Sequence, residues 1–350
     1  MTVALTLGIG LAILANSRPY EGLVVSIPVA LALSYGLISQ NGPPLGVSVK
    51  LILMPLFFVI GLAAVGMAFY NFKITGNALR LPYQVHEATY AVVPNFIWQA
   101  LRPIPNYYHE TIREFHLNYG VPIYNDKQSF SGFIKLNLAA LTMYLLLAGN
   151  VFAIAILGSA RSIVSYLWND HWGRFAIFTY AFFVLGIMLE TYNNLHYFAP
   201  IVPLNYYFIM QAVRLWRRHN PRIGKCIIYG LPLLAIAALS VHVSQTLRHR
   251  DELTPQLQRA RFLARLKQQD GRHLILVKYG PNHSYDREWV YNEADIDGSK
   301  VVWARAMDVN EDCELVKYFK DRTIWSLEID HDEAPIKPKA FQKQLCSSHP

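Results

Sequence analysis

The stretch MTVALTLGIGLAILANSRPYEGLVVSIPVALALSYGLIS, residues 1–39, sets two apolar runs on either side of a short polar hinge. The only charged side chains in it are those of Arg18 and Glu21, which stand three residues apart with Pro19 and Tyr20 between them. A helix needs roughly 20 apolar residues to cross the hydrocarbon core of a bilayer. The stretch therefore predicts a membrane hairpin that carries its charges at the turn.

Similar apolar runs recur along the chain. Hydrophobic residues make up 53% of the 350 residues and charged residues 16%, against roughly 25% charged residues in soluble domains. The apolar blocks cover about residues 2–15, 23–40, 51–70, 134–158, 175–189, 199–213 and 226–244. Buried core strands would be shorter and interrupted by turns. The sequence predicts an α-helical polytopic membrane bundle of about seven transmembrane helices over residues 1–245, followed by a small C-terminal α/β extramembrane domain.

Basic residues in a short loop predict how the bundle is oriented. The loop RLWRRHNPRIGK, residues 214–225, carries five Lys and Arg residues, and short basic loops stay in the cytoplasm. Alternation from this loop places the N terminus, Lys50 and the loop 161–174 inside. It places the hinge, the long segment 71–133, the loop 190–200 and all residues after 245 on the outside. The net charge of +8 fits this topology and a lipid surface, and no aromatic-studded basic motif predicts a nucleic-acid partner.

The last hundred residues differ in character from the rest of the chain. Residues 244–272 have the apolar stripe of a charged amphipathic helix. Strands are predicted at 273–280, 299–307 and 323–330, and a helix at 310–321. The predicted external domain is 246–332, and residues 333–350 are predicted to be a flexible tail because they are rich in Lys, Pro and Ser. Cys313 and Cys346 would share an oxidising compartment there and could pair, although three cysteines give no disulfide framework.

The charged hinge has two interpretations. In the first, it is an interfacial turn in which Pro19 opens the next helix, Glu21 favours the amino end of that helix and Arg18 reaches toward the headgroups. In the second, Arg18 offers a fork-shaped cation to a phosphate, and Glu21 holds the guanidinium in place. Both interpretations are open on local grounds, and the candidate binding residues are Arg18, Tyr20 and Glu21.

A second group of polar residues lies in ETYNNLHYFAP, residues 190–200. A lone histidine here would be a satisfied structural group, but carboxylate, amide, imidazole and phenol groups together favour the lining of a polar cavity. Ionisable groups at the ends of membrane helices are candidates for function by default. The candidate binding residues of this group are Glu190, Asn194, His196 and Tyr197.

The segment 71–133 is too long for a simple connection. Its aromatic residues and prolines predict short helices on the membrane surface, where Tyr and Trp are common and where they also stack on sugar rings. An interfacial plug without a binding role fits the same pattern. The candidates are Arg80, His86, Glu87 and Tyr90. No zinc-ligand spacing, nucleophile elbow or phosphate loop is present, so no metal or other cofactor is predicted, although a divalent metal is not excluded.

Four segments carry a resemblance to a known class of enzyme. They are ANSRPYEG (15–22), NALRLPYQVHEATYAVVPNFIWQ (77–99), HYFAP (196–200) and EWVYNEADIDGSKVVWARAM (288–307). They resemble the latter half of bacterial membrane proteins related to the GT-C glycosyltransferases, the class of the protein O-mannosyltransferases and the lipid A aminoarabinose transferase. The resemblance covers about residues 15–330 and is most specific for a poorly characterised branch.

The resemblance implies a helix bundle in the bacterial inner membrane with a large cavity at its external face. A polyprenyl-phosphate sugar would be the donor, and the reaction would be a displacement at the anomeric carbon of the sugar. Such a reaction needs a carboxylate that takes the proton of the acceptor and cations that hold the departing phosphate. The resemblance makes Arg18 a candidate for the phosphate and Glu21 its orienting partner.

One feature of the class is missing from the chain. GT-C enzymes carry their catalytic aspartate in the first external loop, before the part matched here, so the catalytic residue is unknown. The short first apolar block has no basic region before it, which fits a helix that begins upstream. We therefore expect the aspartate in an upstream segment or a partner. The competing hypothesis is a non-enzymatic subunit that binds a lipid-linked sugar or assembles an envelope complex. A transporter is disfavoured because the polar groups gather on one face.

Overall fold

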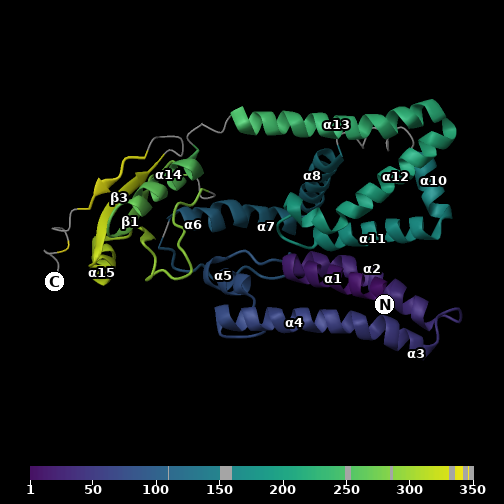
Figure 1. The fold of residues 1–350 in the computed structure, drawn as a ribbon, viewed down its shortest axis with the longest axis horizontal. Coiled ribbons are helices and arrows are strands. Elements are labelled where there is room, and N and C mark those ends of the chain that lie inside the picture. Colours follow the sequence, from purple (N-terminus) through teal and green to yellow (C-terminus); the bar gives the residue numbers. More distant parts are fainter. Residues whose placement is uncertain are drawn as a thin grey trace. The chain divides into compact units, whose positions relative to one another are not determined.

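The computed structural model describes residues 1–108, 110–149, 160–248, 254–283, 287–330, 336–341 and 346. The chain is mostly helical and has one small mixed sheet (Figure 1). It forms two compact units. The first consists of Met1–Pro105 and His116–Leu239, and the second of Asn106–Phe115 and Ser240–Pro350.

The first unit is a bundle of helices. In chain order they are α1 (Thr2–Ser17), α2 (Pro19–Ile38), α3 (Leu45–Ser48), the π-helix η1 (Val49–Leu53), α4 (Met54–Thr75), α5 (Pro82–Tyr90), η2 (Phe115–Gly120), α7 (Val121–Gln128), α8 (Phe130–Gly149), α10 (Ala160–Asn169), α11 (His171–Met188), the 3-10 helix η3 (Leu195–Ile201) and α12 (Val202–His219). Helix α13 (Pro221–Arg248) begins in the first unit and ends in residues of the second.

The described residues contain four helices that are long and apolar enough to cross a membrane. These candidate spans are Pro19–Ile38, Leu45–Thr75, His171–Met188 and Gly224–Arg248. Two further apolar helices, Thr2–Ser17 and Phe130–Leu145, are shorter. The block predicted at 199–213 falls on α12, which is not among the candidate spans, and residues 150–158 of the fourth block lie outside the described residues. The chain is therefore a helical membrane protein by these criteria, and a count of seven spans is not confirmed.

The predicted hinge is reduced to a single residue. Helix α1 ends at Ser17 and α2 begins at Pro19, so only Arg18, with φ −145° and ψ 79°, lies between them. Proline suits the first helical position because its φ is already helical and its missing N–H needs no partner there. A Cβ on Gly22 would lie 2.9 Å from Cβ of Leu14. Glycine at this position therefore lets the two helices approach closely just after the turn.

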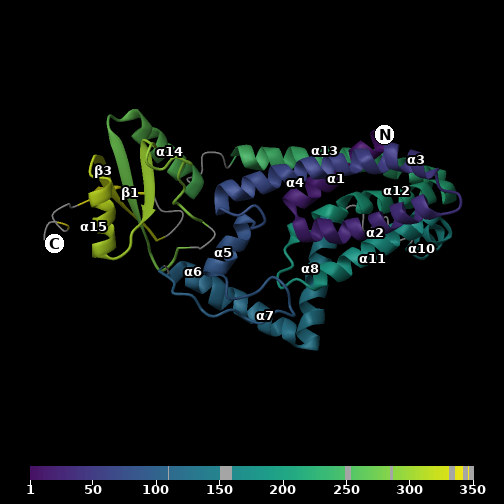
Figure 2. The ribbon, with the colours of Figure 1, turned by 90° about the horizontal axis from the view of Figure 1, so that it is seen from below.

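Helix α2 is held between α1 and α11, and α1 also packs on α4 (Figures 1 and 2). The core between α2, α8, α11 and η3 contains Val24, Tyr144, Phe183, Ile187, Phe198 and Ile201. A Cβ on Gly186 would lie only 2.5 Å from Cγ1 of Val24, so α11 needs a glycine where it crosses α2. This crossing fixes the first turns of α2 against the end of α11.

The second unit contains the sheet. Its elements are α6 (Glu110–Glu114), α14 (Pro255–Gln268), β1 (Arg272–Tyr279), β2 (Val301–Arg305), α15 (Val309–Tyr318), β3 (Arg322–Ile329) and β4 (Lys339–Ala340). The strand order is β2-β1-β3-β4, with β2 and β3 parallel to β1 and β4 antiparallel to β3. Helices α14 and α15 cover opposite faces of this sheet (Figure 2).

The central strand shows why this unit forms. Side chains alternate between the two faces of a strand, so Ile275 and Val277 pack toward α14 while Leu274 and Leu276 pack toward α15. All four are buried, as expected for a parallel strand covered on both faces. The strands and α15 follow the predicted order. The amphipathic helix predicted at 244–272 is instead the end of α13 and the separate helix α14, and residues 249–253 lie outside the described residues.

Two contacts attach part of the segment that the sequence predicted to be a flexible tail. Strand β4 pairs with β3 through Ala340 and Trp325. Cys346 forms a disulfide with Cys313 of α15. Residues 333–335, 342–345 and 347–350 of this segment lie outside the described residues. The two cysteines predicted to share a compartment are therefore bonded to each other.

Candidate functional site

Three segments that the sequence predicted on the same side of the membrane meet at one end of the first unit. The Tyr20 hydroxyl donates to the Gly186 carbonyl at 2.8 Å, and the Tyr20 ring lies edge-on to Phe96 with centroids 4.8 Å apart. Phe96 in turn forms an isolated β-bridge with Glu190. The backbone N–H of Ile97 donates to the Leu189 carbonyl at 3.1 Å. The hinge, the segment 71–133 and the loop 190–200 thus build one site.

Arg18 lies at the centre of this site. Its Nη1 donates to Oε1 of Glu21 at 3.3 Å, and its Cζ lies 4.6 Å from the centre of the Tyr197 ring. The Glu21 side chain is only 6% exposed, whereas the Arg18 side chain is 31% exposed. Among the described residues no other side chain or carbonyl accepts from this guanidinium. We call Arg18, Glu21, Glu190 and Tyr197 the arginine cluster.

Glu190 is a largely buried residue whose carboxyl group has no partner among the described residues. The residue is 7% exposed, and no hydrogen bond or ion pair to its carboxyl is found among the described residues. Burial and the charge of Glu21 raise the pKa of Glu190 to about 8, although Arg18 and Lys127 act in the opposite direction. Glu190 lies beyond the last residue of α11, outside the candidate spans. At neutral pH this side chain is therefore mainly a neutral acid.

A buried lysine supports the loop that carries Glu190. Lys127 is 4% exposed, and its Nζ donates to the Glu190 carbonyl at 2.8 Å, to Oδ1 of Asn193 at 2.9 Å and to Oδ1 of Asn137 at 3.4 Å. Asn193 also donates to Asn137. Burial lowers the pKa of Lys127 to about 8, against the attraction of Glu190. The three acceptors match the three N–H donors of an ammonium group, so this lysine holds α7, α8 and the loop together.

The other residues predicted in the loop 190–200 lie at the edge of the arginine cluster. His196 is exposed, and its ring meets Tyr197 edge-on at a centroid distance of 4.7 Å. Burial and the nearby charge of Arg18 lower the pKa of His196, whereas Glu21 raises it. Asn194 is also exposed, and its carbonyl accepts from the Tyr197 N–H at 2.9 Å. Both residues therefore border the exposed side of Arg18 and Tyr197.

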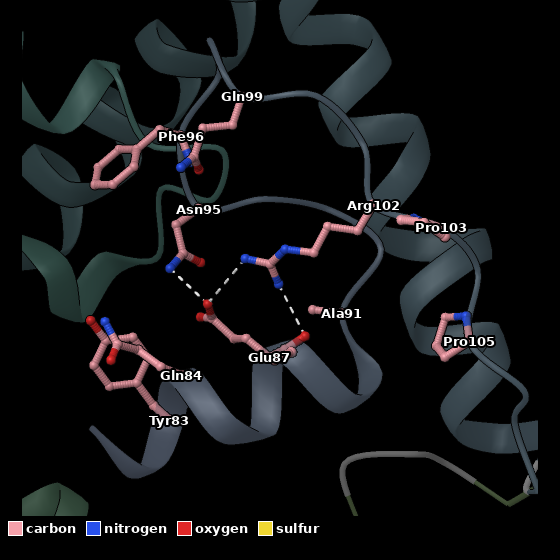
Figure 3. Close-up of a pocket in the computed structure, with 11 residues that line it drawn as sticks. Tyr83, Gln84, Glu87, Ala91, Asn95, Phe96, Gln99, Arg102, Pro103 and Pro105 are labelled. Carbon is pink, nitrogen blue, oxygen red and sulfur yellow. Dashed lines mark hydrogen bonds and ion pairs between the residues drawn. The ribbon is translucent and has the colours of Figure 1, made fainter. Parts of the chain in front are cut away.

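A cavity of about 670 Å³ lies beside the arginine cluster. Figure 3 shows Glu87 of α5 between Asn95, whose Nδ2 donates to Oε2 at 2.9 Å, and Arg102, whose Nη2 lies 3.7 Å from the same oxygen. The Gln99 carboxamide oxygen accepts from the Phe96 N–H at 3.2 Å. The lining residues are Tyr83, Gln84, Glu87, Ala88, Ala91, Asn95, Phe96, Gln99, Arg102, Pro103 and Pro105.

The cavity and the arginine cluster are neighbours. Phe96 lines the cavity and touches Tyr20, which directly precedes Glu21 in the hinge. Burial raises the pKa of Tyr83, and the charges of Glu87 and Glu21 raise it further. The Glu87 and Glu21 carboxylates therefore both raise the pKa of one hydroxyl in the wall of the cavity. The cavity and the arginine cluster thus form one polar region.

Three predicted residues lie on other surfaces. His86 and Tyr90 pack against each other on α5, with ring centroids 5.0 Å apart, and both are exposed. Neither residue lines the cavity, and His86 is turned by about 100° from the cavity-lining residue Glu87, which follows it in the helix. Arg80 is exposed in the turn before α5. Of the candidates in the segment 71–133, only Glu87 lines the cavity.

Sequence reasoning missed the partners of these residues. Lys127, Asn137, Asn95 and Arg102 are not among the predicted site residues. Asn137 could have been found from the sequence, because it is an amide inside the fourth apolar block, where polar groups are costly. The described residues contain no group of three or more His, Cys, Asp or Glu side chains that could hold a metal ion.

Comparisons with protein-family models, with curated proteins and with solved structures gave no significant match.

Proposed function

We propose that the protein binds a polyprenyl-phosphate sugar at the external end of its bundle and acts as a GT-C-like glycosyltransferase when a catalytic carboxylate is supplied by an upstream segment or partner. The observation that carries this proposal is the state of Arg18, which is fixed by Glu21 and Tyr197 and keeps donors available on its exposed side. A non-enzymatic subunit that binds the same lipid would use the same residues.

Arg18 is suited to a phosphate for three reasons. A guanidinium presents its N–H groups in a rigid fork that matches two phosphate oxygens. Only one contact to Glu21, at 3.3 Å, occupies this fork. Arg18 is the single residue between α1 and α2, and α2 is a candidate membrane span. A lipid phosphate at the membrane surface would approach such a position directly.

The adjacent cavity supports a phosphosugar as the ligand. Its volume of about 670 Å³ falls within the range of small-molecule sites. Asn95 donates through its amide nitrogen and Gln99 accepts through its amide oxygen. The amide oxygen of Asn95 and the amide nitrogen of Gln99 therefore remain without a partner among the described residues. Sugar hydroxyls both donate and accept, so they would satisfy both groups. Phe96 offers an aromatic surface between the cavity and the hinge.

We further propose seven passes through a bacterial inner membrane, with the N terminus in the cytoplasm and the second unit in the periplasm. The meeting of the three segments predicted outside supports this orientation, as does the disulfide between Cys313 and Cys346, since disulfides persist in oxidising compartments. Alkaline phosphatase fused after residue 250 should be active in a bacterial host, and fused near residue 220 it should be inactive. The reverse pattern would contradict the topology.

The binding proposal is tested by Arg18→Lys. Lysine keeps the positive charge but loses the fork, and a hydrogen bond to a charged group contributes about 1.5–3 kcal/mol. We expect the variant to bind farnesyl phosphate at least about tenfold more weakly in nanodiscs. Glu21→Gln should also weaken binding, since it leaves the guanidinium less well oriented.

Lys50→Ala is the matched control for the Arg18 variants. Lys50 is exposed in η1, a segment predicted on the cytoplasmic side, so its loss should leave the affinity unchanged. Isothermal titration or a fluorescence assay with purified full-length protein gives the affinities. Equal affinity of the wild type and Arg18→Lys would show that the hinge is only an interfacial turn.

A further inference from the structure

Glu190 stands out because the residue is largely buried, its backbone is anchored and its carboxyl group has no partner among the described residues. Its backbone is fixed from several sides. The Glu190 N–H donates to the Ile187 carbonyl at 3.1 Å, and its carbonyl accepts from Lys127 at 2.8 Å. The next residue, Thr191, donates through its N–H to the Asn95 carbonyl at 2.8 Å. These bonds fix the point on the loop from which the Glu190 side chain starts.

The groups around this carboxyl come from two regions of the chain. The hinge and the first turn of α2 contribute Arg18, Tyr20 and Glu21, and α7 contributes Lys127. Arg18 is paired with Glu21, and Lys127 donates to three carbonyl oxygens. Neither cation is therefore bonded to the Glu190 carboxylate. Burial of an unpaired carboxylate is unfavourable, so the group keeps its proton, in agreement with the raised pKa of Glu190.

We propose that Glu190 is a ligand-binding residue that acts as a neutral acid and donates its O–H to an oxygen of the phosphate group held by Arg18. This inference rests on the proposed function, because it assumes an anion beside Arg18. A carboxyl group that keeps its proton is able to donate a hydrogen bond at neutral pH. The phosphate would supply the acceptor that the described residues do not provide.

The proposal fixes the direction of a pH effect. Below pH 8 Glu190 is neutral and can donate to the anion. Above pH 8 it becomes a carboxylate, which repels the phosphate and competes for Arg18. The affinity should therefore be highest at neutral pH and fall as the pH rises through about 8, the value to which burial raises the pKa of Glu190. If only the protonated form binds, linkage predicts a loss of about tenfold between pH 7 and pH 9.

The test compares Glu190→Gln and Glu190→Ala in the full chain. The probe is farnesyl phosphoryl mannose, a phosphodiester whose single negative charge does not change between pH 7 and pH 9. The glutamine N–H₂ also donates but does not titrate, so Glu190→Gln should bind within about twofold of the wild type at pH 7 and should lose the pH dependence. Glu190→Ala has no donor and should bind several-fold more weakly at pH 7. These factors are on the order expected for one hydrogen bond.

A control variant and the pH response of Glu190→Gln separate the contribution of Glu190 from that of the neighbouring titratable groups. Asp126→Asn removes an exposed acidic group next to Lys127 and should behave as the wild type at both pH values. Lys127 also titrates near pH 8, because burial lowers its pKa to about 8. A fall in affinity that is equally large in Glu190→Gln would assign the effect to Lys127 and overturn the inference.

The outcomes also distinguish this inference from the proposed function. Binding that depends on Arg18 but is unchanged in Glu190→Ala and at pH 9 would overturn the role of Glu190 and leave the phosphate site intact. Binding that does not depend on Arg18 would overturn the proposed function, and this inference with it.

Discussion

Replacement of Lys127 by Met should destabilise the protein, because a buried acceptor that loses its donor costs about 1–3 kcal/mol. Lys127 is 4% exposed, and its ammonium group donates to oxygens of Glu190, Asn193 and Asn137. Methionine fills a similar volume but donates no hydrogen bond, so all three oxygens lose this donor in a buried site. The loop that carries Glu190 should loosen, and phosphate binding should be lost with it.

Thermal unfolding of the detergent-solubilised full chain measures this effect. Lys135→Met is the matched control, because Lys135 is an exposed lysine on α8 and its loss should change the midpoint little. The triple variant Lys127→Met with Asn137→Leu and Asn193→Leu should recover part of the loss, since it also removes both side-chain acceptors and leaves only the Glu190 carbonyl without this donor. A midpoint for Lys127→Met equal to that of Lys135→Met would contradict the role of this lysine.

Replacement of Gly186 by Ala should destabilise the bundle, although alanine is normally favoured over glycine in a helix. The added Cβ would lie 2.5 Å from Cγ1 and 3.4 Å from Cβ of Val24. Val24 is 6% exposed and, as a β-branched residue, has few alternative rotamers. Overpacking of this kind costs about 1–3 kcal/mol, which exceeds the gain of about 1 kcal/mol in helix propensity. The shift of α2 should also weaken phosphate binding, because Tyr20 donates to the Gly186 carbonyl.

Replacement of a second glycine by alanine should have the opposite effect on stability. A Cβ on Gly61 of α4 would meet no atom within 4 Å, so Gly61→Ala should leave stability unchanged or raise it. Val24→Ala in the Gly186→Ala background should restore part of the lost stability by making room for the new methyl group. The unfolding midpoints of the wild type and these three variants measure the effect. Equal midpoints for Gly186→Ala and Gly61→Ala would show that α2 and α11 do not meet as closely as described.

The sequence predicts those features that depend on neighbours along the chain. The apolar runs predict the helices, and Pro19 marks the first residue of α2. The strand-like apolar run at 273–280 predicts β1. These elements follow from local composition and periodicity, which act over a few residues.

The site could be predicted only in part, because its contacts join distant segments. Lys127 meets Glu190 and Asn193 across 63 and 66 residues of sequence, and no local pattern encodes such a pairing. The polar residues of the segment 71–133 indicate Glu87 but not its partner Arg102. They indicate His86 together with Glu87, but the turn of α5 places His86 on another side of the helix.

The central claim is that a lipid phosphate binds at Arg18, and the most direct measurement is a structure of the full-length protein in a nanodisc with farnesyl phosphoryl mannose. We expect the phosphate within hydrogen-bond distance of the Arg18 guanidinium, which should still be paired with Glu21. The same density should place a phosphate oxygen beside the Glu190 carboxyl and the sugar in the cavity next to Glu87. A phosphate bound elsewhere on the protein, with Arg18 contacting only Glu21 and Tyr197, would contradict this claim.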